Sequence, residues 1–247
     1  MERWIEGTVV ENKRWNERLC SLRVKADAPS FEAGQFLRLG LEVNGDFIAR
    51  PYSLVNPPNS DFSEFYFNCV PEGPLSPKLH SLEAGDKVWL SQMVAGFLTL
   101  SATPQGERLW MLATGTALGP FLSILQAGEV WHRFKTVVLV HGVRSVDELT
   151  YLDLIDDVKA GYGDRFIPVA SITREKVNCA ISERISDAIH SGSLEQKTGL
   201  TLENELDRIM ICGNPGMVQG CLEALEEKGF RRHRRREPGH IVMEIYK

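Results

Sequence analysis

One stretch in the middle of the chain sets its fold class: Leu109-Trp110-Met111-Leu112-Ala113-Thr114-Gly115-Thr116-Ala117-Leu118-Gly119-Pro120. Its apolar first half is typical of a buried strand, and it runs into a glycine turn that opens a helix-like segment ending near Gly128. A buried strand followed by a helix is the repeating unit of a parallel α/β sheet. We therefore place the beginning of an α/β domain here.

The same rhythm continues toward the C-terminus. Further strands are predicted at 137–140, 166–170 and 209–212, and helices at 147–160 and from about 217 to 228. Pro168 has no backbone N–H, so its strand is expected at an edge of the sheet. Ile241, Met243 and Ile245 recur at every second position, which predicts a last strand near the C-terminus. Strands that alternate with helices predict a parallel, doubly wound sheet.

The pattern of apolar and turn residues is different before residue 101. Short β-rich runs occur at 8–10, 19–24, 35–39, 65–70 and 87–90. Turn residues separate them, as at Asn44-Gly45-Asp46 and Asn56-Pro57-Pro58-Asn59. Many short strands with turn signals between them predict a sandwich or a barrel. The chain is therefore expected to contain two domains, 1–101 and 102–247.

Composition excludes several classes of protein. A net charge of −5 gives no reason to expect nucleic acid or a membrane as a partner. No apolar run approaches the roughly 20 residues that span a bilayer. The N-terminus lacks a signal-peptide pattern. The five cysteines are odd in number and form no C-x-x-C pair, which argues against a disulfide framework and against a metal site. We expect a cytoplasmic protein without a metal.

Arg50-Pro51-Tyr52-Ser53 combines three useful groups at a predicted strand end. An arginine offers a fork of donors to a diphosphate, a tyrosine ring can lie against a flat heterocycle, and a serine hydroxyl can reach a ring nitrogen. The alternative is an ordinary strand with a core tyrosine and a solvated arginine.

Glu72-Gly73-Pro74-Leu75-Ser76-Pro77-Lys78-Leu79 reads as a glycine turn that enters a short helix. Free N–H groups at such a start, with Ser76 beside them, favour a phosphate. An ordinary Ser-Pro helix start is the alternative.

Two further turns follow predicted strands of the second domain. The turn at Thr114-Gly115-Thr116 lets the backbone approach a pyrophosphate, although its spacing is not G-x-G-x-x-G. The turn at Cys212-Gly213-Asn214 follows the strand at 209–212, and a tight turn there can bring the thiol and the backbone near a nicotinamide. Packing of a small residue at a strand end is the alternative for Cys212. No histidine is obviously paired with this thiol, so nucleophilic catalysis is not expected.

Taken in order, these segments resemble the plant-type ferredoxin–NADP⁺ reductase superfamily, and within it the bacterial ferredoxin (flavodoxin)–NADP⁺ reductases. The C-terminal Glu244-Ile245-Tyr246 adds to the resemblance, with Lys247 after the tyrosine. The resemblance covers residues 4–247. It implies a six-stranded antiparallel barrel that binds FAD noncovalently, followed by a five-stranded parallel NADP domain.

The resemblance also implies the cofactor sites. Residues 244–247 are expected to return to the flavin. The residues expected at FAD are Arg50, Pro51, Tyr52, Ser53, Tyr66, Phe67, Asn68, Cys69, Pro74, Leu75, Ser76, Thr116, Tyr246 and Lys247. Those expected to act in catalysis are Ser53, Cys212, Glu244 and Tyr246, with Tyr246 on the flavin face where the nicotinamide enters and Glu244 in proton exchange.

NADPH is the expected dinucleotide. An NAD-selective unit usually places a carboxylate at the end of its second strand. Here the strand at 137–140 leads to Arg144 instead, and Arg174 and Arg184 follow. Three guanidinium groups can bind a 2′-phosphate through charge-assisted hydrogen bonds, although each alone is also typical of a solvated surface. The residues expected at NADP(H) are Thr114, Gly115, Thr116, Val143, Arg144, Thr173, Arg174, Arg184, Gly213 and Asn214.

The implied activity is hydride exchange between NADP(H) and FAD, with single electrons passed to ferredoxin or flavodoxin. The basic run at Arg231–Arg236 would suit these acidic carriers, and its alternatives are a solvated turn or a nucleic-acid patch. Competing functions are an electron-transfer component of an oxygenase, for which no cluster-like cysteine spacing exists, a flavin or quinone reductase, and a non-catalytic flavin-binding sensor. A monomer is expected.

Overall fold

The computed structural model describes residues 3–246, which pack as two compact units. The first unit contains the chain up to Gly96 together with Gly119–Ala127. The second contains Phe97–Leu118 and the chain from Gly128 onward. The change of unit at Gly96 lies close to the change of sequence texture at residue 101. Among residues 3–246, no helix combines the length and the apolar character that a membrane crossing requires.

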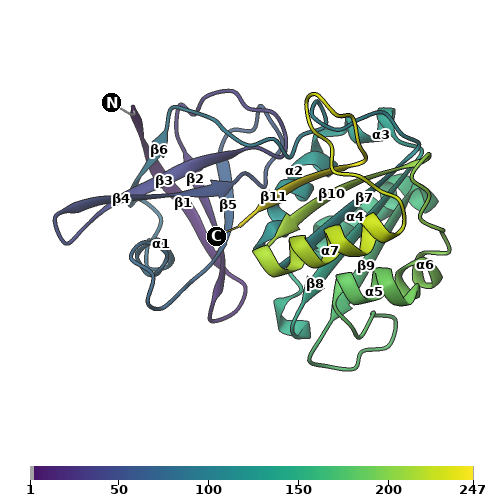
Figure 1. Cartoon of the computed structure of the whole chain (residues 1–247). Helices are drawn as coiled ribbons and strands as arrows, with labels where there is room; N and C mark the ends of the chain where they lie inside the picture. The colour runs from purple at the N-terminus through teal and green to yellow at the C-terminus, as the bar shows by residue number, and fades with distance from the viewer. Residues whose placement is uncertain (1–2, 247) are drawn as a thin grey trace. The chain divides into compact units, whose positions relative to one another are not determined.

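The first unit is built on one antiparallel sheet (Figure 1). Its six strands follow the order β4-β3-β6-β1-β2-β5, and the two edge strands meet at an isolated bridge between Leu54 and Phe65. This confirms the six-stranded antiparallel expectation. The elements are β1 Trp4–Arg14, β2 Leu19–Lys25, β3 Phe36–Val43, β4 Asp46–Ser53, β5 Ser63–Asn68, α1 Ser76–His80 and β6 Lys87–Ser91.

Local turn chemistry sets the register of the β3–β4 hairpin. Asn44 and Gly45 adopt φ values of 54° and 90°, which is the left-handed backbone that a two-residue hairpin requires and that Asn-Gly tolerates. The hairpin pairs Val43 with Asp46 at its tip and Phe36 with Ser53 at its base. Arg50, Tyr52 and Ser53 are thereby held at the far end of a paired strand.

Helix α2, Gly119–Ala127, packs with the first unit although it follows the first parallel strand in sequence. The Ser123 hydroxyl donates to the carbonyl of Asn56 at 2.7 Å, and Gln126 Nε2 donates to the carbonyl of Val55 at 2.8 Å. Gly128 ends the helix with φ 83°, as a left-handed C-cap glycine does. The end predicted near Gly128 is confirmed, and the helix covers the loop that follows β4.

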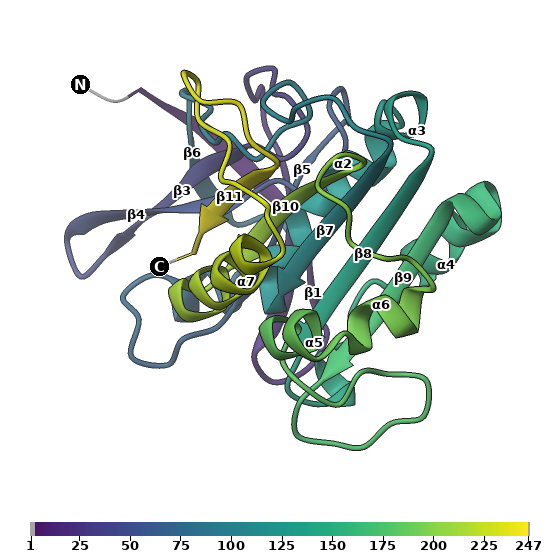
Figure 2. The ribbon, with the colours of Figure 1, turned by 45° about the vertical axis from the view of Figure 1, so that its right-hand side comes forward.

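The second unit contains a five-stranded parallel sheet in the order β11-β10-β7-β8-β9 (Figure 2). Its strand that contains Pro168 is an edge strand, as predicted. Side chains of α5, α6 and α7 share one apolar core with the sheet. The elements are β7 Arg108–Thr114, α3 Val130–Arg133, β8 Thr136–Val143, α4 Leu152–Tyr162, β9 Phe166–Ile172, α5 Ile185–Ser191, α6 Ser193–Thr198, β10 Asp207–Gly213, α7 Pro215–Glu227 and β11 Ile241–Ile245.

The helix predicted at 147–160 is wrong at its beginning. A 3-10 turn occupies Val146–Glu148, and α4 starts at Leu152. Tyr151 has a φ of 56°, a left-handed conformation that cannot continue a right-handed helix, and its side chain is buried. Burial of Tyr151 outweighs the helical signal of the preceding acidic residues.

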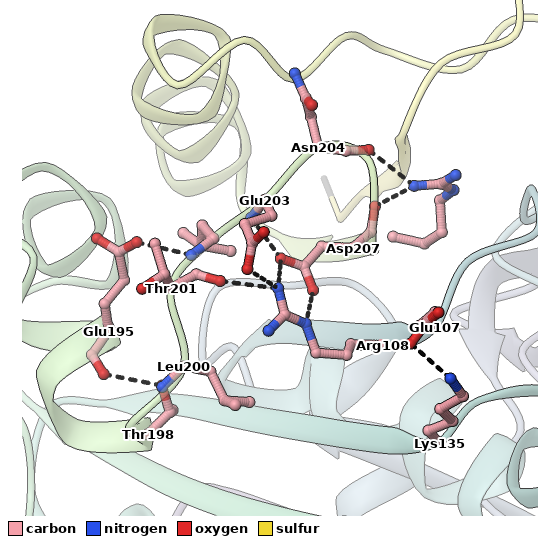
Figure 3. Close-up of polar contacts among 12 residues, drawn as sticks. Glu107, Arg108, Lys135, Glu195, Thr198, Leu200, Thr201, Glu203, Asn204 and Asp207 are labelled. Atoms are coloured by element: carbon pink, nitrogen blue, oxygen red, sulfur yellow. Dashed lines mark hydrogen bonds and ion pairs between the residues drawn. The ribbon is translucent and has the colours of Figure 1, made fainter.

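The amino ends of β7 and β10 are joined by a buried ion pair (Figure 3). Arg108 Nε donates to Asp207 Oδ1 at 2.6 Å and Nη2 to Oδ2 at 2.9 Å. Nη2 also reaches the carbonyl of Thr201 at 2.9 Å and the Glu203 carboxylate at 3.2 Å. The guanidinium pairs with the fully buried Asp207 carboxylate, which would otherwise be an uncompensated buried charge.

Candidate functional site

The carboxyl ends of β7 and β10 form the centre of the candidate site in the second unit. The chain runs from β7 outward through β8 to β9 and returns on the other side of β7 as β10, so the strand order reverses between these two strands. Ligands of open α/β sheets bind at such a reversal, outside the carboxyl ends of the strands. The predicted turns at Thr114–Thr116 and Cys212–Asn214 are brought together there, since Ala113 pairs with Cys212.

A small residue is required where these turns meet. A β-carbon on Gly213 would come 2.5 Å from Thr114 Oγ1 and 2.9 Å from Met217 Sδ. Thr114 Oγ1 is buried and has no hydrogen-bond partner within the described residues. A β-carbon on Gly115, whose φ is 54°, would meet nothing within 4 Å. An unsatisfied hydroxyl beside a bare glycine turn suits an approaching polar ligand such as a pyrophosphate.

His141 supports the same turn from β8. Its Nε2 lies 3.1 Å from the carbonyl oxygen of Gly115, and the ring is buried. Burial lowers the pKa of His141 to about 4, more than the bond to Gly115 and the charge of Glu148 raise it. A neutral imidazole therefore donates to Gly115 at ordinary pH. This role was not predicted from the sequence, because a single histidine at the end of an apolar strand carries no motif.

Cys212 of β10 and Glu244 of β11 lie together with Tyr246, which directly follows β11. Cys212 pairs with Glu244, and the backbone N–H of Tyr246 donates to the carbonyl of Gly213 at 2.8 Å. Burial and the charge of Glu244 raise the pKa of the Cys212 thiol, and these outweigh a hydrogen bond with the Tyr246 side chain. A buried neutral thiol agrees with the expectation that Cys212 is not a nucleophile.

Glu244 is a carboxyl group that changes charge near neutral pH. Burial raises its pKa to about 7, against the lowering effect of a hydrogen bond from the backbone of Phe97. A group whose pKa lies near the working pH can both accept and donate a proton. This suits the proton-exchange role expected for Glu244. Lys247, expected near FAD, lies outside the described residues.

The arginines expected at a 2′-phosphate lie on neighbouring loops. Thr173 N–H donates to the carbonyl of Val143 at 3.1 Å, and Arg174 N–H donates to the carbonyl of Arg144 at 2.8 Å. These bonds bring the four residues side by side beyond β8 and β9. Arg184 precedes α5 at its N-cap, and the Ser171 hydroxyl of β9 donates to the adjacent Glu183 carbonyl at 2.6 Å. All three guanidinium groups are exposed.

Asn214 is the N-cap residue of helix α7. Its side-chain oxygen accepts from the backbone N–H of Met217 at 3.0 Å, as an N-cap residue does. Its side-chain oxygen is therefore already bonded in this conformation.

In the first unit, the Arg50–Ser53 segment occupies the end of β4. Burial raises the pKa of Tyr52 to about 12, although the charge of Arg50 opposes this. The Tyr52 and Phe67 rings meet edge to face with centroids 5.7 Å apart. Arg50 is exposed and Ser53 is buried. An exposed guanidinium can donate to a diphosphate, and an aromatic ring near it can lie against a flat heterocycle.

The expected residues on β5 and in the loop that follows it lie near this segment in the sheet. Tyr66 and Phe67 are buried, while Asn68 and Cys69 are partly exposed. Ser76 is already engaged, because its hydroxyl accepts from the backbone N–H of Val70 at 3.0 Å and donates to the carbonyl of Val70 at 3.5 Å. It therefore shapes the loop that contains Pro74 and Leu75, and a phosphate there would have to rely on backbone donors.

The basic run forms a small hairpin, defined here as the basic hairpin, residues 231–240. Arg231 N–H donates to His240 Nδ1 at 3.0 Å and Gly239 N–H to His233 Nδ1 at 3.2 Å. The arginine side chains at 231, 232, 234, 235 and 236 are exposed. Arg234 and Glu237 form an exposed ion pair at 3.4 Å. The hairpin presents clustered positive charge to solvent.

Comparison with known proteins places this chain among reductases. Residues 111–223 match the family model described as the oxidoreductase NAD-binding domain. The chain is 42% identical over 247 residues to a flavodoxin/ferredoxin–NADP reductase of Escherichia coli (strain K12), covering all of both chains. It is 37% identical to a ferredoxin–NADP reductase of Azotobacter vinelandii, covering 96% of this chain and 95% of that one.

A solved structure agrees with these relatives. The structure of a ferredoxin NADP⁺ reductase from Neisseria gonorrhoeae with bound FAD and NADP matches with a TM-score of 0.93 and 34% identity, and the match covers 98% of each chain. With this coverage the match extends into both units, and the matched residues share the fold of that protein.

Proposed function

Because the chain belongs to the flavodoxin/ferredoxin–NADP reductase family, we propose that it exchanges a hydride between NADP(H) and bound FAD and single electrons with ferredoxin or flavodoxin. When the carrier is reduced, one NADPH yields NADP⁺, one proton and two electrons, and two carrier molecules accept one electron each. FAD supplies the ability to take two electrons together and release them singly. The protein is an oxidoreductase, and its residues bind, orient and protect these groups.

The observation that carries this proposal is the meeting of Thr114, Gly115 and Gly213 at the reversal of strand order. A bare turn, an unsatisfied hydroxyl and a glycine required by packing suit a pyrophosphate at this edge. The adjacent loops supply Arg144 and Arg174, with Arg184 beyond β9, for a 2′-phosphate. The same edge carries Glu244 and Tyr246. Binding and proton exchange are therefore supported at one end of the second sheet.

We assign FAD to the first unit. Arg50 would bind the diphosphate, the Tyr52 ring would lie against the isoalloxazine, and Ser53 would reach a ring nitrogen. The exposed guanidinium of Arg50 and the aromatic contact of Tyr52 with Phe67 support this assignment, since they place a cation and an aromatic ring in one segment. Tyr246 would cover the flavin face, so residues 1–101 and 102–247 would act as the FAD and NADP(H) halves.

The basic hairpin is proposed as the docking surface for acidic carriers. Its exposed arginines would steer a carrier of opposite charge toward the protein and raise the rate of association. The protein is proposed to act as a monomer in the cytoplasm, where its unpaired cysteines would stay reduced.

A visible spectrum tests the proposal directly. The purified protein should be yellow, NADPH should bleach it under anaerobic conditions, and it should reduce cytochrome c only after ferredoxin or flavodoxin is added. Carrier-independent reduction of quinones or free flavin would indicate a different reductase. Failure of NADPH to bleach the colour would indicate a sensor. A colourless protein that cannot be reconstituted with FAD would refute the proposal.

A further inference from the structure

Glu148 holds the Arg144 side chain from one side. Oε1 of Glu148 accepts from Nε of Arg144 at 2.7 Å and also from its Nη2, while Oε2 accepts from the Arg144 backbone N–H at 2.9 Å. We propose that Glu148 is a positioning residue for NADPH: it fixes Arg144 so that the remaining edge of the guanidinium meets the 2′-phosphate. This inference rests on the role given to Arg144 in the proposed function.

The geometry leaves one edge of the guanidinium for a ligand. A guanidinium carries five N–H donors in a planar fork, and Glu148 binds the side formed by Nε and Nη2. The donors of the opposite edge point away from Glu148. The Arg144 side chain is 45% exposed, whereas that of Glu148 is 15% exposed. The carboxylate is thus packed behind the arginine, and the arginine faces solvent.

The backbone on both sides of the pair is also fixed. Glu148 ends the 3-10 turn Val146–Glu148, and the carbonyl of Arg144 accepts from the Arg174 N–H at 2.8 Å. An arginine held at its backbone and along its side chain loses less freedom when it binds an anion than a mobile one does. Glu148 should therefore improve the affinity of Arg144 for a phosphate.

Repulsion between Glu148 and the phosphate acts in the opposite direction. Burial disfavours the charge of Glu148, but the hydrogen bonds from Arg144 outweigh it and lower the pKa of Glu148. Glu148 in turn raises the pKa of Arg144. Asp147 and Glu175 add negative charge nearby, and Glu175 accepts from the Val146 N–H at 3.3 Å. Because the guanidinium lies between Glu148 and the open edge, attraction to Arg144 acts over the shorter distance and should prevail.

The test compares two ligands that differ only in the 2′-phosphate. Calorimetry on the FAD-loaded protein would measure binding of 2′-phospho-ADP-ribose and of ADP-ribose. Glu148→Ala should weaken the phosphorylated ligand about fivefold to tenfold and leave the other unchanged. Glu148→Gln, which keeps an acceptor for Nε, should lie between wild type and Glu148→Ala. In steady-state assays, KM for NADPH should rise by the same factor, with kcat and KM for NADH preserved.

Two further variants make the result specific. In an Arg144→Ala background, Glu148→Ala should have no additional effect on binding of the phosphorylated ligand. Glu107→Ala is the matched control, since Glu107 pairs with Lys135 at 2.8 Å beside the opposite ends of β7 and β8, and it should change neither ligand. Unchanged or tighter binding in Glu148→Ala would overturn the inference. If Arg144→Ala bound each of the two ligands as tightly as the wild type does, the role of Arg144 itself would be refuted instead.

Discussion

The hydroxyl oxygen of Thr114 lies directly against Gly213, since a β-carbon on Gly213 would come within 2.5 Å of it. The two residues end neighbouring strands, β7 and β10, that are 99 positions apart at their paired starts, Arg108 and Asp207. The contact joins two turns that are distant in sequence. It explains why one of them must contain a residue without a side chain.

Gly213→Ala should therefore destabilise the protein and disturb nucleotide binding. Relief of the contact requires a shift of Thr114, for which we expect a loss of about 1 to 3 kcal/mol in the free energy of unfolding and a severalfold rise in KM for NADPH. Urea denaturation and steady-state kinetics would measure both. Gly161→Ala is the control, because a β-carbon there meets nothing within 4 Å and α4 should gain about 0.5 to 1 kcal/mol. If Gly213→Ala were destabilised but kept the wild-type KM for NADPH, the contact would serve packing and not nucleotide binding.

His141 should make stability depend on pH. Burial lowers its pKa from 6.5 in an unfolded chain to about 4 in the folded protein, so the unfolded state binds the proton more readily. The free energy of unfolding should therefore be unaffected by His141 above pH 6.5 and should fall, by roughly 3 kcal/mol in total, as the pH decreases from 6.5 toward 4. His141→Gln, which keeps a donor for Gly115, should flatten this part of the profile. Chemical denaturation between pH 4 and pH 8 would detect the change, and an unaltered slope would contradict the assignment.

Glu244 should govern a pH dependence of turnover. Its pKa is raised to about 7, so the carboxyl is protonated below that pH and ionised above it. The dependence of kcat on pH should contain a transition near 7 that disappears in Glu244→Gln. Burial also disfavours the ionised form of this carboxyl. The free energy of unfolding should therefore decrease as the pH rises from 4.5 through 7. A transition that persists unchanged in Glu244→Gln would place its origin elsewhere.

The basic hairpin can be tested by charge reversal. Arg232→Glu combined with Arg235→Glu should lower kcat/KM for ferredoxin or flavodoxin by roughly tenfold or more at low salt, because complementary charge steers association. Added salt should reduce the difference. Reduction of ferricyanide by NADPH should not change. Lys197→Glu, a charge reversal at an exposed position of α6, is the control. Equal losses with the carrier and with ferricyanide would exclude a docking role.

The Arg108–Asp207 pair should contribute to stability and leave binding untouched (Figure 3). Arg108→Met leaves the fully buried Asp207 without its guanidinium, for which we expect a loss of about 3 to 5 kcal/mol. Glu107→Ala, which breaks the exposed pair with Lys135, should cost less than about 1 kcal/mol. Urea denaturation would compare them. Similar losses in both variants would contradict the distinction between buried and exposed pairs.

Much of the architecture could be predicted because its signals are local. Asn44-Gly45 sets a hairpin, Gly128 ends α2, and Pro168 lies on an edge strand, in each case through the backbone preferences of one or two residues. The predicted beginning of α4 was wrong because Tyr151, which is buried, takes a left-handed conformation. No neighbouring residue in the sequence indicates that conformation.

The sequence by itself determined the β-rich character of the first unit, the alternation of strands and helices in the second, and the chemical types present at the turns. Only the tertiary structure decided which turns meet: Cys212 lies beside Ala113 and Glu244, His141 supports Gly115, and Glu148 orients Arg144. The physical reason is one of range. Dihedral preference and periodicity act over a few residues, whereas strand order and register follow from burial of side chains that are distant along the chain.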